Sequence, residues 1–176
     1  SRTGSPLVGA GELGAYGELP VPGPHTAAEL DTVLGLLAGP RSRIAAVSVG
    51  HGRDRASRAA AEAFGAAWRA RGGVVLAVVD WPESAASWLR PARRLTAQVP
   101  DAWVVAGAVA GWAQMGRRLR HSTDWDPYRT VAFASLYDPR LPALAGPGVL
   151  HGLRGATADG DTWEVSGGWV RSPATR

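Results

Sequence analysis

The chain contains no cysteine and no lysine, and no apolar run approaches the length of a membrane-spanning helix. The lack of cysteine excludes disulfide bonds and thiolate chemistry. A spanning helix needs ~20 consecutive apolar residues, so no membrane insertion is expected. The first residues also lack the charged, apolar and small-residue pattern of a signal peptide. These absences do not predict the cellular compartment, because a cysteine-free chain suits an exported protein as well as a cytosolic one.

All 19 basic residues are arginine, and the formal net charge is +4 with a sequence pI of about 10.6. A lysine-free chain reaches a high pI automatically, since arginine stays protonated. The two arginine pairs, Arg93-Arg94 and Arg117-Arg118, fall inside expected amphipathic helices. They favour solvated helix faces over a nucleic-acid site, so no nucleic-acid partner is predicted.

Common catalytic and cofactor motifs are missing as well. The sequence has no G-x-S-x-G elbow, no Walker motif and no dinucleotide-binding glycine fingerprint. The four histidines are scattered without the spacing of metal ligands. We therefore predict no cofactor, no structural metal and no enzyme activity.

The sequence instead alternates short apolar runs with amphipathic stretches. A first helix is expected after Thr26 and should end at Gly39-Pro40. Strands are expected at 43–49, 74–81, 102–106 and 130–135, helices at 54–71, 84–99, 111–120 and 138–145, and a hairpin at 162–170. The turn after the first strand is expected at residues 50–52, and Pro91 should kink or split its helix.

This alternation predicts an α/β protein, a three-layer doubly wound and mostly parallel sheet covered by helices on both faces. We expect an irregular Gly/Pro-rich segment at 1–24, a single α/β domain at 25–170 and a tail at 171–176. Of the eight tryptophans, Trp68 and Trp88 are expected in the core. The tryptophans expected at the surface or at an interface are Trp112, Trp125, Trp163 and Trp169.

Four segments together resemble the leucine/isoleucine/valine-binding family of type I periplasmic binding proteins. They are RIAAVSVGHGRDRASRAAAEAFGAAWRARGGVVL, WPESAASWLRPARRLTAQVPDAWVVAG, AGAVAGWAQMGRRLR and SLYDPRLPALAGPGVLHGLRGAT. Upstream of them, PGPHTAAELDTVLGLLAGPRSRIAAV resembles the segment where the family's chain crosses into its second lobe. The resemblance lies in the order and spacing of these segments and covers about residues 22–157. It implies only the carboxyl-side lobe of an ABC-transporter substrate-binding protein, and an extracytoplasmic location. A missing lobe also implies a partner lobe or a homo-oligomer.

In open α/β sheets, ligands bind beyond the carboxyl ends of the strands. Three loops are expected at that edge: Gly50–Asp54, Ala106–Gln114 and Ser135–Asp138. The first offers backbone N–H groups and a helix amino terminus, which suit a small polar or anionic ligand. The predicted ligand-binding residues are Gly50, His51, Gly52, Arg53, Asp54, Gly107, Trp112, Tyr137 and Asp138.

Structural explanations compete with each of these assignments. The glycines at 50 and 52 would equally serve a tight strand-to-helix turn. A tryptophan at a helix start commonly packs in the core, and Asp138-Pro139 commonly starts a helix. The resemblance also implies a carboxylate for a ligand ammonium near Gly111, but the loop AGAVAGW holds no acid.

Two other functions remain open at this point. The chain could be an interaction domain that has kept the fold and lost the ligand. His51 and its flanking glycines also resemble the strand-end histidine of sirohydrochlorin-type cobalt or nickel chelatases, in which an imidazole binds the metal. That function needs a second ligand at a neighbouring strand end, and no other histidine falls on an equivalent position.

Overall fold

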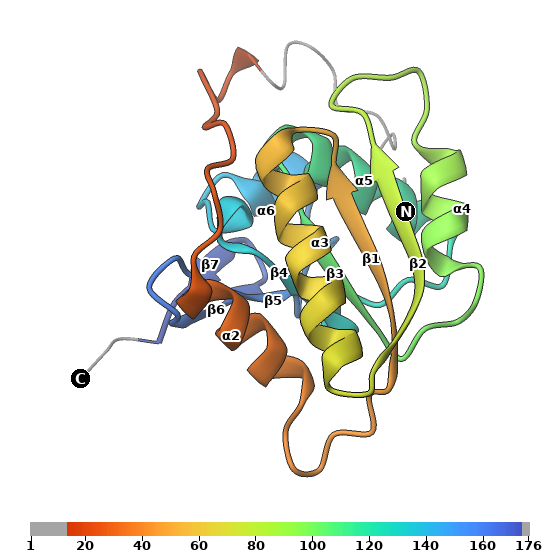
Figure 1. The fold of residues 1–176 in the computed structure, drawn as a ribbon. Helices are drawn as coiled ribbons and strands as arrows, with labels where there is room; N and C mark the ends of the chain where they lie inside the picture. The colour runs from red at the N-terminus through yellow and green to blue at the C-terminus, as the bar shows by residue number, and fades with distance from the viewer. Residues whose placement is uncertain (1–13, 174–176) are drawn as a thin grey trace.

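The computed structural model describes residues 14–173, which form a seven-stranded sheet with helices on both faces (Figure 1). The expected α/β class is confirmed. The helices are α2 (Ala27–Leu37), α3 (Arg55–Ala70), α4 (Leu89–Thr96), α5 (Val109–Ser122) and α6 (Leu141–Ala145). The strands are β1 (Ala46–Gly52), β2 (Val74–Trp81), β3 (Ala102–Ala106), β4 (Thr130–Ala132), β5 (Arg154–Ala156), β6 (Thr162–Ser166) and β7 (Trp169–Arg171).

The strand order is β2-β1-β3-β4-β5-β6-β7, parallel from β2 to β5 and antiparallel for the last two pairs. The helices α2 and α3 pack on one face, where Phe64, Trp68 and Leu37 are buried. The helices α4, α5 and α6 pack on the other face, and most of the tryptophans are buried there. β3 is buried at all five residues because it is covered from both sides.

The helix ends follow from local chemistry. Thr26 and Glu29 form a capping box at the start of α2, in which each side chain lies at the other residue's backbone N–H. Asp54 caps α3 by accepting a hydrogen bond from the Ser57 N–H at 2.9 Å. These caps fix where both helices begin, and both beginnings lie at the carboxyl edge of the sheet.

Several sequence predictions are wrong in detail. β1 continues through Gly52, so residues 50–52 are strand and not turn. Pro91 does not kink a helix: α4 begins at Leu89, and a proline in the first turn lacks only an N–H that would have no helical partner. The short strand β5 was missed altogether. The hairpin at 162–170 is confirmed, with its turn at Gly167 and Gly168.

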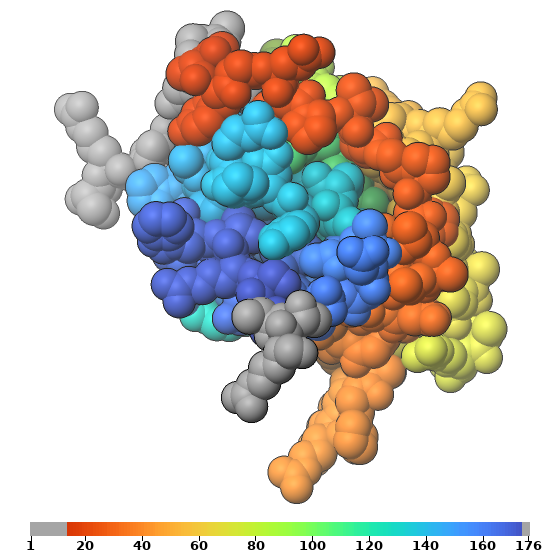
Figure 2. Space-filling view, turned by 90° about the vertical axis from the view of Figure 1, so that its left-hand side faces the viewer, coloured from red at the N-terminus to blue at the C-terminus, as the bar shows by residue number. Residues whose placement is uncertain are grey.

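The described part of the Gly/Pro-rich segment crosses the edge of the molecule beside β4. Tyr16 and Leu19 pack against the cluster on the α5 side, and the Glu18 carbonyl accepts a hydrogen bond from Arg140. His25 then contacts Phe133 edge-to-face at 6.1 Å, on the α2 side. Figure 2 shows this segment in red above the cyan residues. The rest of the predicted segment, residues 1–13, lies outside the described residues.

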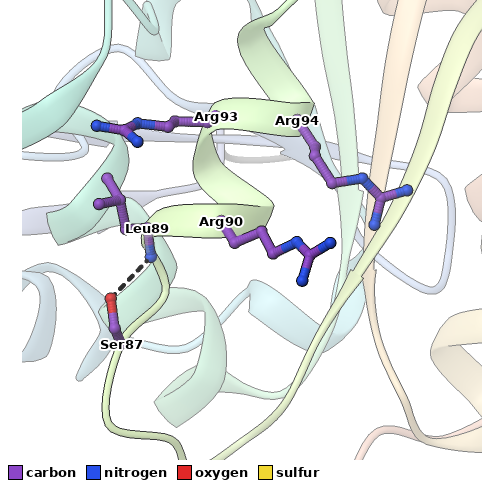
Figure 3. A pocket seen from close by; sticks show the side chains of 5 residues that line it. All are labelled: Ser87, Leu89, Arg90, Arg93 and Arg94. Carbon is purple, nitrogen blue, oxygen red and sulfur yellow. Dashed lines mark hydrogen bonds between the residues drawn. The ribbon is translucent and has the colours of Figure 1, made fainter.

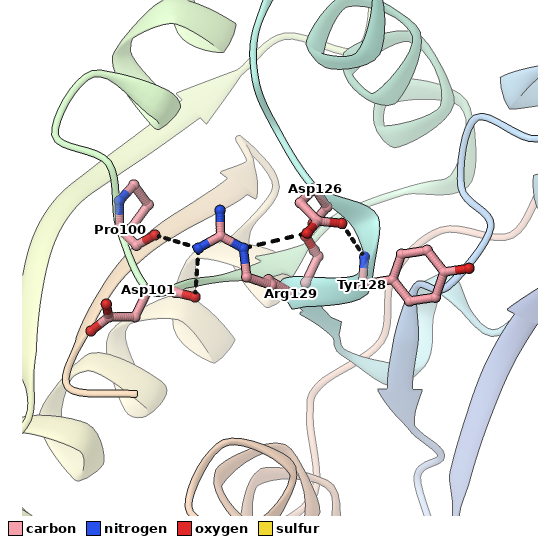
Figure 4. Close-up of polar contacts among 6 residues, drawn as sticks. Pro100, Asp101, Asp126, Tyr128 and Arg129 are labelled. Atoms are coloured by element: carbon pink, nitrogen blue, oxygen red, sulfur yellow. Dashed lines mark hydrogen bonds and ion pairs between the residues drawn. The ribbon is translucent and has the colours of Figure 1, made fainter. Parts of the chain in front are cut away.

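The opposite, amino edge of the sheet is tied together by Arg129 (Figure 4). Its guanidinium donates to the carbonyls of Pro100 and Asp101, at 3.4 Å each, and pairs with Asp126. The same group lies 5.1 Å from the ring centre of Trp103. Among residues 14–173, no helix has the length and apolar character required to span a bilayer.

Candidate functional site

The topology singles out the edge formed by the carboxyl ends of β1 and β3. These strands are neighbours, but β1 leads into α3 on one face and β3 leads into α5 on the other. Such a reversal opens the edge between two loops, which is where doubly wound sheets bind ligands. His51 pairs with Ala106 across the two strands. The first and second predicted loops are therefore brought together.

The side chains of the first loop are partly committed to the fold. His51 is only 6% exposed, and its Nδ1 lies 2.6 Å from the Gly52 carbonyl oxygen. Arg53 pairs with Asp80 at 3.2 Å, with both side chains largely exposed. Asp54 is used as the cap of α3. Of these residues, Arg53 is the most accessible to a ligand.

Trp81, at the end of β2, fills the space beneath the two loops. A Cβ added at Gly50 would lie 2.5 Å from Trp81 Cζ3, and one added at Gly107 would lie 3.2 Å from Trp81 Cζ2. The indole is fully buried and lies 5.7 Å, centre to centre, from Trp112. Glycine at 50 is thus required by the close approach of an aromatic ring.

Glu83, in the loop after β2, places a carboxylate at the amino end of α5. A Cβ added at Gly111 would overlap this carboxylate, and Gln114 Nε2 donates to the Glu83 carbonyl at 3.1 Å. The cap residue of α5, Ala108, has no side chain that could accept a hydrogen bond. The Glu83 carboxylate therefore provides the negative charge that this helix end favours.

The electrostatics at this edge are unfavourable for a further anion. Residue Glu83 is exposed to solvent, but partial desolvation of its carboxylate against the loop and helix raises its pKa; the neighbouring Gly111 N–H opposes the shift, and the charge of Asp54 adds to it. Both carboxylates border Gly52, since a Cβ there would lie 3.0 Å from Asp54 Oδ1 and 3.3 Å from Glu83 Oε1. Two helix amino ends are occupied by the chain's own carboxylates.

The third predicted loop touches the second but binds its own polar groups. Ser135 Oγ donates to the Gly107 carbonyl at 2.7 Å. Asp138 is 5% exposed and accepts two hydrogen bonds from the Arg140 side chain, at 2.6 and 2.8 Å, which hold its pKa below the usual value. Tyr137 stacks on Trp163 at 5.7 Å and is 42% exposed. Asp138 is consequently part of the local scaffold.

With this geometry in place, the fold can be compared with solved structures. A substrate-binding periplasmic protein from Ralstonia solanacearum superposes with a TM-score of 0.65 at 18% identity over 89% of this chain. A branched-chain amino acid ABC transporter periplasmic ligand-binding protein from Burkholderia xenovorans LB400 superposes with a TM-score of 0.60 at 13% identity over 78% of this chain. An extracellular ligand-binding receptor from Rhodopseudomonas palustris HaA2 superposes with a TM-score of 0.57 at 17% identity over 73% of this chain.

The chain has the fold of one lobe of a type I periplasmic binding protein. It spans 40%, 36% and 33% of the three chains just named, which is the share that one lobe takes. The fold that the resemblance implied is confirmed. No family model and no curated protein matches the sequence.

In this fold, three tryptophan predictions are wrong. Trp112, Trp125 and Trp163 are each at most 3% exposed, so Trp112 does not form a ligand-facing wall. Trp169 is 70% exposed, as expected. Two residues that border the site, Trp81 and Glu83, were missed. Their position at the end of the predicted strand 74–81 indicated that they lie at this edge, because parallel strands end at one edge, but it did not indicate which residues they contact.

A metal centre finds no support at this edge of the lobe. Within residues 14–173, no group of three or more histidine, cysteine or acidic residues could hold a metal ion. His51 contacts a backbone carbonyl through Nδ1, and a chelatase would need a second ligand beside it. Two surface cavities, of about 350 and 250 Å³, lie elsewhere, at α4 and at the amino edge of the sheet. None of the nine predicted site residues lines either cavity.

Proposed function

We propose that this chain is the ligand-binding half of a two-lobed small-ligand receptor, and that its ligand carries a cationic group. The observation that carries the proposal is the Glu83 carboxylate at Gly111, where the resemblance implied an acid and the second loop holds none. The acid comes from the loop after β2 instead. An ammonium group bound there would offset the partial desolvation of the Glu83 carboxylate and its repulsion by Asp54.

This proposal replaces the expectation of an anionic ligand with a cationic or zwitterionic one. Helix amino ends attract anions, but those of α3 and α5 already hold Asp54 and Glu83. A zwitterion could place its ammonium at Glu83 and its carboxylate near Arg53, whose side chain is 58% exposed. An opposing lobe would then close the second side of the cleft.

Leucine and its two single-group analogues test the proposal by NMR titration of the labelled chain. Leucine and isoamylamine, which keep the amine, should shift the amide signals of Gly52, Gly107 and Gly111 saturably. Isocaproate, which keeps only the carboxylate, should not. Glu83→Gln should weaken amine binding by about tenfold, which corresponds to 1.4 kcal/mol. Glu62→Gln, on the exposed side of α3, is the matched control.

Preferential binding of isocaproate would contradict the proposal, because the acidic edge would then not favour a cationic group over an anionic one.

One observation favours a second function, an interaction domain without a ligand: the Trp81 indole already fills the space under Gly50 and Gly107. If none of the three compounds shifts these amides, and the melting temperature depends only on protein concentration, the interaction domain is the correct assignment.

A further inference from the structure

The outer edge of the sheet at β2 has no strand partner in the described chain. β2 is the first strand in the sheet order and pairs only with β1. With eight residues it is also the longest of the seven strands. Its outward backbone N–H and C=O groups are therefore available to another extended segment.

The side chains of β2 do little to protect this edge. Val74 and Val78 are 50% and 49% exposed, and the strand contains neither proline nor a basic residue. Its one charged residue, Asp80, is paired with Arg53. The pairing with β1 shifts register once, beside Leu76, which leaves a regular run from Ala77 to Trp81. Natural edge strands commonly carry charges or prolines that prevent pairing with another strand. The run from Ala77 to Trp81 has no proline, and its only charged side chain, Asp80, is paired with Arg53.

Two arginines of α4 lie beside the same edge. α4 covers β2, with Ala92 and Leu95 buried beneath it. Arg93 points toward α5, since it lines a cavity with Ser122 and Thr123. Figure 3 shows Arg90 and Arg94 extending to the side opposite Arg93, which is the outer side of the sheet.

These arginines are exposed, and neither has an ion pair with any residue in 14–173. Together with Ser87, Leu89 and Arg93 they line the cavity of about 350 Å³. Arginine guanidinium groups bind carboxylates through paired hydrogen bonds. A strand added at β2 would therefore meet positive charge on the α4 side and valine side chains along the edge.

We propose that β2 is a docking edge for an extended acidic segment of a partner polypeptide. The segment would add to the sheet as an eighth strand, through backbone hydrogen bonds to β2, and its carboxylates would reach Arg90 and Arg94. A second copy of this chain fits less well. Antiparallel pairing of two β2 strands across a twofold axis would place Arg90 and Arg94 of both copies on the same face, where they repel each other.

A fluorescent peptide of alternating valine and glutamate tests this proposal, with a valine–glutamine peptide as the neutral comparison. The acidic peptide should bind the chain saturably in anisotropy measurements, and more weakly as salt is raised. Hydrogen exchange should show new protection at residues 74–81 when the peptide is bound. The double variant Arg90→Glu/Arg94→Glu should lose affinity by at least about tenfold.

Arg41→Glu/Arg120→Glu is the matched control, because it makes the same charge change at two other exposed arginines. It should retain binding within about twofold. Equal loss in both double variants would show a diffuse charge effect and overturn the proposal. Binding without new protection in β2 would overturn it too. A chain that sediments as a dimer with β2 already protected would assign the edge to a second copy instead.

Discussion

At the scale of single residues, Val99 is held in a conformation that valine avoids. Its φ is +48°, and among the described residues it is the only non-glycine residue with positive φ. The left-handed region costs an L-residue about 1–2 kcal/mol, and a β-branched side chain is especially unfavourable there. Its side chain is 80% exposed, so it contributes little burial in return.

We therefore expect Val99→Asn to raise the free energy of unfolding by about 1 kcal/mol, because asparagine tolerates this conformation. Urea denaturation of the two proteins measures the difference. Val21→Asn is the control, since Val21 is 84% exposed and has no positive φ. A gain of the same size at position 21 would show that the cause is loss of an exposed apolar side chain and not relief of strain.

Two glycines predict opposite effects of the same substitution. Gly50→Ala would place a methyl group 2.5 Å from Trp81 Cζ3 in a closely packed region. Such overpacking costs about 1–3 kcal/mol. Gly35→Ala, in the middle of α2, meets nothing within 4 Å and should stabilise by about 0.5–1 kcal/mol. Thermal unfolding of both variants checks the signs, and a neutral Gly50→Ala would show that the Trp81 ring is free to move.

These residues also show what the sequence predicts at this scale. Gly50 and Gly52 were predicted to serve a ligand or a tight turn, whereas Gly50 lies in β1 and makes room for the Trp81 ring, a contact that no local pattern records. The burial of Trp112 was missed because a tryptophan at the start of a helix has the same pattern whether that helix end is covered or open. Glu83 was missed because its contact with Gly111 spans 28 residues of chain, and no local pattern records such a contact.

At the scale of elements, most long periodic segments were predicted well and short ones poorly; the exception is the helix expected at 84–99, of which only Leu89–Thr96 is α4. The helix expected at 54–71 is α3 (Arg55–Ala70), and the strands expected at 74–81 and 102–106 match β2 and β3. β5 has three residues and pairs only at Arg154–Ala156, which is too short for a period to appear. The end of β1 was placed too early because glycines usually mark turns, whereas here β2 and β3 both continue beside it.

The amino end of α5 gives a pH-dependent prediction for Glu83→Gln. Because partial desolvation raises the pKa of Glu83, the folded chain binds this proton more tightly than the unfolded chain does. The contribution of Glu83 to stability is therefore most favourable below its unfolded pKa, about 4.3, and decreases as the pH rises through the folded pKa. Relative to the variant, the native chain should become more stable as the pH falls from about 7 to about 4, which spans the whole interval between the folded and the unfolded pKa.

Urea denaturation of both proteins at the two pH values measures this difference. Glu62→Gln makes the same substitution on the exposed side of α3 and corrects for general effects of losing a charge. A native-minus-variant difference that does not change between the two pH values would mean that the Glu83 carboxylate does not pack against the amino end of α5 in solution. The ligand proposal would then lose its geometric basis as well.

At the scale of the whole molecule, one sheet supports two separate apolar clusters. Trp68 lies in the cluster on the α3 side, whereas six tryptophans, including Trp81 and Trp112, lie in the cluster on the α5 side. Both clusters are built on the same central strands, since Val104 of β3 belongs to one and Val105 to the other. Loss of either helix layer would expose one face of β3, so the two faces should unfold together.

A single cooperative domain over residues 25–170 can be tested with probes on the two faces. Tryptophan fluorescence of Trp68→Phe reports the α5-side cluster, and hydrogen exchange of the α3 amides reports the other. Both should give the same urea midpoint and the same dependence on urea concentration. If α3 lost its protection at lower urea, the α3 face would be a separate, weaker unit. That result would also fit a lobe whose α3 side is stabilised by contacts with another polypeptide. Without that polypeptide, the α3 layer would be the less stable layer and would unfold first.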